Sequence, residues 1–142
     1  MCLPNNSKII LSLNRDKDSR GDILSIVDQI SSNVSIIKCN KGSIRSNHYH
    51  LTDWHFMYVL EGSIDYFYKN VDSEVVKYIN VQKDENIFTP CMEIHGTYFP
   101  EDTRLIVTSK NPRDQDTYEK DTVRVNFIND ANIMELLSKY KK

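Results

Sequence analysis

Two histidines separated by a single residue, His48 and His50, constrain the middle of this chain more than any other feature. In an extended strand successive side chains point to opposite faces, so both imidazoles would lie on one face and converge on one spot. The four residues after His50 can turn the chain, which would start a return strand at His55 beside the first two. The spacing therefore predicts three converging histidines on neighbouring strands.

Short β-type runs bounded by turn residues follow one another along the chain. They are rich in Val, Ile, Tyr and Phe, which strands prefer, and Glu61-Gly62 favours a tight turn between two of them. The expected strands are residues 23–27, 34–39, 55–60, 63–68, 75–81 and 104–108. This pattern predicts an all-β fold.

Apolar residues near the C-terminus follow a helical spacing instead. Four of them share one helical face, after two capping candidates: Ile133, Met134, Leu136 and Leu137 follow Asn129 and Asp130. We predict a short closing helix at about residues 130–140, packed on the outside of the domain or against a dimer mate. Homodimerisation is expected because sheets of this size need their edges covered.

The chain length suits a single domain that spans residues 1–142, with a core at about residues 20–110. A net charge of −2 argues against a nucleic-acid-binding surface. The three cysteines follow no zinc or redox spacing, which favours the reducing cytoplasm. No apolar run approaches the ~20 residues that span a bilayer. We therefore expect a cytoplasmic protein that binds neither nucleic acid nor membrane.

The segment from Gly42 to Gly62 resembles the first cupin motif: Gly, five residues, His-x-His, four residues, a ligand-type residue, six residues, Gly. Residues 84–95 resemble the second cupin motif at Pro90 and His95. The family pattern has glycines where this chain has Asp84 and Met92, and usually an asparagine where it has Phe99. The resemblance implies a single jelly-roll β-barrel.

The same resemblance implies a metal centre formed by His48, His50, His55 and His95, with one divalent ion such as Zn, Fe, Ni or Mn. His55 stands where cupins usually carry a glutamate ligand. Replacing a carboxylate by an imidazole leaves the ion one unit more positive. The alternative is a cupin that has lost its metal and uses the same histidines for acid–base chemistry.

Two further segments indicate a sugar substrate. Residues 18–24, which contain Arg20, resemble the Asp-x-Arg-Gly segment that opens many cupins acting on nucleotide-linked deoxysugars. Residues 47–50 and 116–124 resemble the cupin domain at the end of capsular-polysaccharide sugar reductases. The resemblance implies an epimerase or isomerase of a keto-deoxysugar nucleotide, with Arg20 meeting the anionic substrate. The alternative without this resemblance is that Gly21 only forms a turn, Arg20 is solvated and Asp121 pairs with a Lys or Arg from outside the segment.

Such a reaction needs an acid and a base near the metal. Tyr66 and Tyr98 are candidate acids because they lie on or beside the motif strands, and Glu93 is a candidate base because it shares a face with His95. The alternatives are that Glu93 lies in an exposed turn and that the two tyrosines belong to the core. Strict alternation would turn Tyr98 away from His95. Trp54 is a candidate for stacking on a sugar or base, although it could equally be a packing residue.

Two other functions fit the same histidines. A mononuclear-iron dioxygenase or a lyase acting on a small organic acid needs neither Arg20 nor a nucleotide. A non-catalytic module that binds a metabolite needs no base. Proton exchange at a sugar carbon, oxygen uptake or ligand binding alone would separate the three functions.

Overall fold

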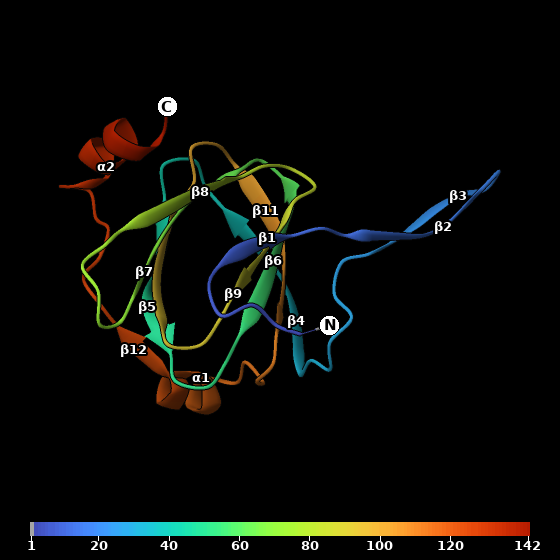
Figure 1. Cartoon of the computed structure of the whole chain (residues 1–142), viewed down its shortest axis with the longest axis horizontal. Helices are drawn as coiled ribbons and strands as arrows, with labels where there is room; N and C mark the ends of the chain where they lie inside the picture. Colours follow the sequence, from blue (N-terminus) through green and yellow to red (C-terminus); the bar gives the residue numbers. More distant parts are fainter. Residues whose placement is uncertain (1) are drawn as a thin grey trace.

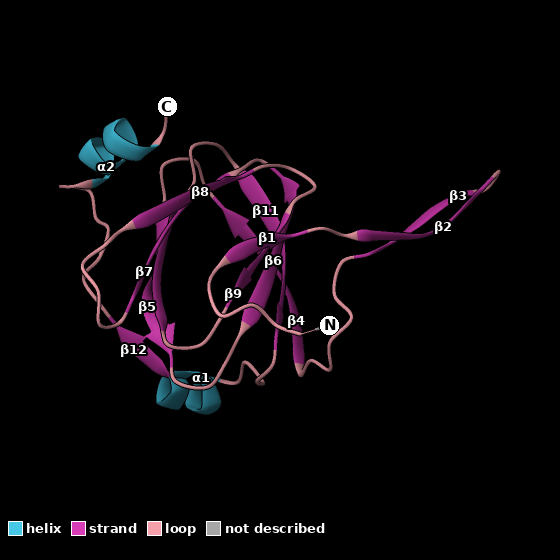
Figure 2. Ribbon diagram, in the orientation of Figure 1, coloured by secondary structure: helices cyan, strands magenta, loops and turns pink. Residues whose placement is uncertain are grey.

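The protein consists of two five-stranded antiparallel sheets that pack face to face (Figure 1, Figure 2). The structure is a computed structural model that describes residues 2–142, apart from the side chains of residues 13 and 14. The first sheet contains, in spatial order, β1 (Lys8–Ile10), β9 (Asn86–Thr89), β6 (His55–Glu61), β11 (Thr103–Ser109) and β4 (Asn33–Cys39). The second contains β12 (Thr122–Arg124), β5 (Ile44–His50), β10 (Glu93–Tyr98), β7 (Ile64–Asn70) and β8 (Lys77–Val81). These sheets confirm the prediction of an all-β jelly-roll.

The main hydrophobic core fills the space between the sheets. Alternate residues of each strand point inward, because side chains alternate between the two faces of a strand. Met57 and Val59 of β6 thus meet Ile64 and Tyr66 of β7 in one buried cluster. The cluster also contains Cys39, Val81, Ile87, Phe99, Leu105 and Val107. This core holds the two sheets together.

A second cluster covers the outer face of the second sheet. Phe67 and Ile94 point outward from β7 and β10 and pack against Phe127, Ile128 and Ile133 of the C-terminal segment. Ile133 begins α2 (Ile133–Tyr140), which confirms the predicted closing helix with a later start. The helix begins after Asn132, because the Asn129 side chain caps a turn at the amides of residues 131 and 132 instead.

A projecting hairpin and a second helix were not predicted from the sequence, although the strand expected at residues 23–27 overlaps the second strand of that hairpin. A hairpin of β2 (Leu13–Asp18) and β3 (Gly21–Ser25) projects away from the two sheets (Figure 1). The polar helix α1 (Gln115–Asp121) lies beside β12 at one end of the jelly-roll (Figure 1). Its N-cap, Asp114, accepts a hydrogen bond from the amide of Thr117 at 3.0 Å. No helix within residues 2–142 is long and apolar enough to cross a membrane.

The turns at Asp84 and Met92 keep a conformation that normally suits glycine. Their φ angles are +67° and +57°, in the left-handed region. These are the two turn positions at which the cupin motif carries glycines. The turn before His95 is therefore formed in the expected way, although Met92 is strained there.

Candidate active site

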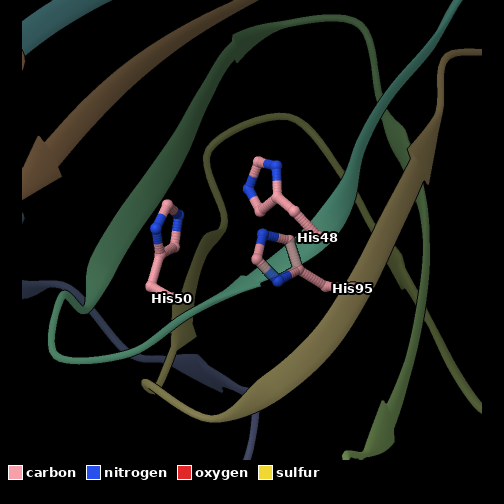
Figure 3. Close-up of side chains that lie close together, drawn as sticks. All are labelled: His48, His50 and His95. Atoms are coloured by element: carbon pink, nitrogen blue, oxygen red, sulfur yellow. The ribbon is translucent and has the colours of Figure 1, made fainter. Parts of the chain in front are cut away.

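The four histidines gather between the sheets, from three strands. His48 and His50 come from β5, His95 from β10 beside it, and His55 begins β6 in the opposite sheet. His95 pairs with His48 across the strands, and their ring centroids are 4.8 Å apart. Those of His48 and His50 are 4.7 Å apart. Figure 3 shows the rings of His48, His50 and His95 grouped together, as the strand alternation predicts.

His48, His50 and His95 form the tightest group. Each offers a ring nitrogen, and these three atoms all lie within 4.8 Å of one another. His55 lies beside this group, with its ring centroid 5.2 Å from that of His95 and 5.7 Å from that of His50. The structure therefore brings together all four histidines named from the sequence, and the ring nitrogens of His48, His50 and His95 form a group without His55.

Local hydrogen bonds leave two Nε2 atoms unused. His95 Nδ1 lies 3.2 Å from the carbonyl oxygen of Glu93, which can only accept a hydrogen bond. The proton of neutral His95 therefore sits on Nδ1, and Nε2 carries the lone pair. The Nε2 atoms of His50 and His95 are buried and have no hydrogen-bond partner among the described residues. A buried polar atom without a partner is costly, so these two nitrogens suit an ion or a ligand.

Burial keeps the histidines neutral. Desolvation lowers the pKa of His50 to about 4 and the pKa of His95 to about 3. Desolvation, with the neighbouring His95 and His50, lowers the pKa of His48 to about 2. The fully buried His55 has its pKa shifted well below its ordinary value by the same cause. Neutral imidazole is the form that binds a metal and the form that accepts a proton.

This donor set fits a divalent metal ion. Nitrogen ligands suit Zn, Fe, Ni and Cu, and three histidines are a ligand set that catalytic metal sites use. His50 and His95 contribute partnerless lone pairs, and His48 stands next to both of them. The ordinary second contact of a metal-binding histidine is also present, because the opposite nitrogen of His95 faces a backbone carbonyl.

A cavity of about 90 Å³ opens beside the histidines. His48 and His55 line it together with apolar side chains of the inner core. The other lining residues are Arg45, Ser46, Thr97, Arg113 and Tyr118. The Arg113 guanidinium lies 5.3 Å from the centre of the Tyr118 ring, and its buried Nε has no hydrogen-bond partner among the described residues. The Tyr118 ring is also 5.7 Å from that of His50. The cavity thus combines cationic, phenolic and imidazole groups.

Sequence reasoning missed Arg45, Arg113 and Tyr118 as cavity residues. Arg45 lies within the first motif segment, three residues before His48, but strand alternation alone gave it no role. Tyr118 is on α1, and Arg113 immediately precedes the capping Asp114. The available sequence signal was a capping residue, Asp114, followed by a short polar helix. This segment lies outside residues 20–110, which were expected to form the core.

Tyr66 and Glu93 face inward, but neither lines the cavity. The Tyr66 ring stacks on His95 at 6.0 Å, while its hydroxyl bonds to Ser7 Oγ at 2.8 Å and Thr89 Oγ1 at 2.7 Å. The Glu93 carboxylate accepts hydrogen bonds from the backbone amide and the hydroxyl of Ser7. Burial raises the pKa of both groups. These contacts tie the N-terminal segment to the layer behind His95.

Tyr98 and Trp54 point away from the histidines. Tyr98 packs in the outer cluster with Ile94 and Phe127, which takes it out of the set of acid candidates. Strand alternation from His95 is the reason. The Trp54 ring packs against Phe56 and Phe88 at 5.5 and 6.3 Å, so this residue is a packing residue and does not reach the cavity.

Arg20 does not face the cavity as the resemblance implied, and Asp121 has other partners than the alternative without the resemblance expected. Arg20 is at the tip of the projecting hairpin, where its exposed side chain pairs with Asp18 at 2.6 Å and does not line the cavity. Among the described residues, no lysine or arginine forms an ion pair with Asp121. Its carboxylate bonds to the turn after His50, at the amides of Thr52 and Asp53.

Comparison with solved structures identifies the architecture. No family model matches the chain, and no curated protein matches it either. One similar structure is that of QdtA, a sugar 3,4-ketoisomerase from Thermoanaerobacterium thermosaccharolyticum, in complex with TDP. It superposes on this chain with a TM-score of 0.68 and a sequence identity of 20%. The superposition covers 97% of this chain and 99% of the QdtA chain.

Two other sugar isomerases give similar values. A 3,4-ketoisomerase from Helicobacter canadensis has a TM-score of 0.67 at 14% identity, over 93% of this chain and 97% of that one. WlaRA, the TDP-fucose-3,4-ketoisomerase from Campylobacter jejuni, has a TM-score of 0.65 at 20% identity, over 83% and 88%. The paired five-stranded sheets, the two motif segments and these superpositions together show that the chain has the cupin fold.

Proposed function

We propose that this chain is a metal-dependent isomerase of a nucleotide-linked keto-sugar. The observation that carries the proposal is the grouping of His48, His50 and His95 within 4.8 Å, next to a cavity with two arginines in its wall. The fold likeness supports it, because one similar QdtA structure contains TDP-4-keto-6-deoxyglucose. A keto-sugar joined to a diphosphate would present both a carbonyl and an anion to such a cavity.

In this proposal His48, His50 and His95 hold one divalent ion, and His55, which lies outside this group of ring nitrogens, is left free for proton transfer. When bound, a divalent ion polarises a carbonyl and stabilises the negative charge that develops on its oxygen. The same histidines without a metal could take up and release protons directly, which is the alternative form of the proposal. Elemental analysis of the purified protein separates the two forms.

The reaction needs proton transfers that the cavity residues can perform. In a 3,4-keto shift, carbon 3 and its hydroxyl each lose a proton, while carbon 4 and its oxygen each gain one. The neutral imidazole of His55 faces the cavity and can accept a proton. The Tyr118 phenol, on the same wall, can return one. His55 and Tyr118 thus replace Glu93 and Tyr66 as the favoured base and acid.

Arg45 and Arg113 would bind the diphosphate of the substrate. Both line the cavity, and guanidinium groups form paired hydrogen bonds with phosphate oxygens. Arg113 is held over the Tyr118 ring, which orients its planar group. This arrangement supports an anionic, nucleotide-linked substrate over a small neutral sugar.

A homodimer is part of the proposal. A two-stranded hairpin is marginally stable alone in water, and the β2–β3 hairpin projects from the sheets (Figure 1). Leu24 on this hairpin is 43% exposed, while Val34 and Ile36 on the edge strand β4 are 68% and 63% exposed. A second copy would cover these surfaces. Light scattering should give twice the chain mass, and Ile36→Lys with Leu24→Lys should give the monomer.

The function is tested with TDP-4-keto-6-deoxyglucose in deuterated buffer, followed by proton NMR. We expect enzyme-dependent incorporation of deuterium next to the carbonyl and appearance of the 3-keto sugar. The variant Tyr118→Phe should slow the conversion, whereas Tyr58→Phe, a change on the outer face of β6, should not. Binding of the sugar without exchange would contradict the proposal in favour of a binding module. Oxygen uptake with a small organic acid would contradict it in favour of a dioxygenase.

A further inference from the structure

The junction between α1 and β12 contacts His50 on the side opposite to its partnerless nitrogen. Thr122 pairs with His50 across β12 and β5, and its Oγ1 lies 3.3 Å from His50 Nδ1. The same hydroxyl donates a 2.6 Å hydrogen bond to the carbonyl oxygen of Tyr118. A threonine hydroxyl has one proton, and a carbonyl oxygen can only accept. Thr122 Oγ1 therefore accepts from His50 Nδ1.

Asp121 adds a negative charge at the same place. Its Oδ2 lies 3.7 Å from His50 Nδ1 and also accepts the Asp53 amide at 3.0 Å. Its Oδ1 accepts the amide and the hydroxyl of Thr52 at 2.9 and 2.7 Å. The carboxylate thus holds the turn that links His50 to His55. Because it can only accept hydrogen bonds when ionised, it also favours a proton on Nδ1.

We propose that Thr122 and Asp121 are positioning residues that hold His50 as the tautomer with its proton on Nδ1. His50 Nε2 then presents its lone pair next to His48 and His95. The carbonyl of Glu93 fixes His95 in the same tautomer, so the two partnerless Nε2 atoms are equivalent. The inference rests on the proposed function in one respect: it takes His50 Nε2 as the atom that binds a metal ion or accepts a proton.

The proposal has a measurable consequence for ligand binding. A histidine that exchanges freely between tautomers presents the correct lone pair for only part of the time. Removing a hydrogen-bond partner of a metal-binding histidine typically lowers metal affinity by about 10–100-fold. The Thr122→Val variant keeps the shape of the side chain and removes the acceptor at His50 Nδ1, together with the donor to the Tyr118 carbonyl oxygen. Asp121→Asn keeps the size and removes the charge.

The test is long-range proton–nitrogen NMR on metal-free protein labelled with ¹⁵N-histidine, which reports the tautomer of each ring. We expect His50 protonated on Nδ1 in the native protein, and a substantial Nε2-protonated population in both Thr122→Val and Asp121→Asn. Zinc affinity, measured by chelator competition, should fall by about 10–100-fold in parallel. Thr122→Ser keeps the hydroxyl and should give the native result in both measurements. Thr108→Val, the same change on β11 at the outer groove, should alter neither.

An Nε2-protonated His50 in the native protein would overturn the proposal. So would an unchanged Nδ1 proton in both variants. The amide spectrum of each variant shows whether it is folded, and Thr122→Val keeps the test decisive if Asp121→Asn unfolds. The NMR readout uses no substrate, so a correct tautomer with no exchange on TDP-4-keto-6-deoxyglucose would reject the proposed function and leave this inference standing.

Discussion

The side chain of Asn47 makes two hydrogen bonds with the backbone of Ile128. Its Nδ2 donates to the Ile128 carbonyl at 2.7 Å, and its Oδ1 accepts the Ile128 amide at 3.0 Å. Asn47 sits at a bulge in β5 with a φ of +58°, directly before His48. Gly96 on β10 leaves room for this pair, since a Cβ there would lie 2.8 Å from Asn47 Oδ1. The bulge that aims His48 is thus fixed by the C-terminal segment.

Asn47→Ala should destabilise the protein by about 1–3 kcal/mol, because it leaves a buried backbone amide and carbonyl without partners. Urea unfolding of the metal-free protein measures the change. Asn40→Ala, at an exposed position, is the matched control and should change stability by less than about 0.5 kcal/mol. Equal effects of the two changes would contradict a special role for the Asn47–Ile128 pair.

Met92→Gly should stabilise the protein by up to about 1 kcal/mol. The reason is the left-handed backbone of Met92, at a φ of +57°, which glycine adopts without a Cβ clash. Thermal unfolding measures the effect. Cys91→Gly, one residue earlier and outside the left-handed region, should instead lower the melting temperature because it only adds freedom to the unfolded chain. Two shifts of the same sign would count against the strain at Met92.

Acidification should destabilise the metal-free protein already between pH 7 and 5. Desolvation places the pKa of His50 at about 4 and that of His95 at about 3, whereas histidines of the unfolded chain titrate near 6.5. The unfolded state therefore binds more protons below pH 6.5, so stability is complete above that pH and falls as the pH approaches 4. Each histidine contributes about 1.4 kcal/mol per pH unit there.

Urea unfolding in the presence of a chelator, at pH 7, 6 and 5, measures this slope. His50→Gln removes one of the buried histidines and should reduce this slope by the contribution of one histidine. A stability that stays constant from pH 7 to 5 would show that the histidines are not buried in the neutral form.

Arg113→Gln should weaken binding of TDP by about tenfold, because a charged hydrogen bond to phosphate contributes about 1.5–3 kcal/mol. Isothermal titration calorimetry at two salt concentrations measures the loss, which should shrink at higher salt. Arg104→Gln removes an arginine whose partner is Glu61, outside the cavity lining, and should leave the affinity unchanged. Equal affinities of native protein and Arg113→Gln would place the nucleotide elsewhere.

The histidine group could be predicted from the sequence because it depends on local geometry. A spacing of two along a strand places His48 and His50 on one face whatever the rest of the fold does. The same rule turns Trp54 and Tyr98 away from the histidines flanking them, and the structure places both outside the cavity. The assignment of Tyr98 to the site required an exception to this alternation, and its side chain does not make one.

The remaining site residues depend on contacts between distant segments. Glu93 shares the inner face with His95, but Ser7, 86 residues away, occupies its carboxylate. Arg113 and Tyr118 reach the cavity only because β12 pairs with β5 and brings α1 to the end of the jelly-roll (Figure 1). A three-residue strand and a seven-residue polar helix carry little periodic signal, so this pairing could not be foreseen.

The central claim is that His48, His50 and His95 form one metal centre. The most direct test is elemental analysis of untagged protein, after purification and after incubation with Zn, Fe, Ni or Mn salts. The account predicts close to one equivalent of a divalent metal per chain in the native protein and none in His50→Ala or His95→Ala. A chelator should lower the melting temperature of the native protein but not that of the two variants. Native protein that stays metal-free, and whose melting temperature no metal or chelator changes, would contradict it.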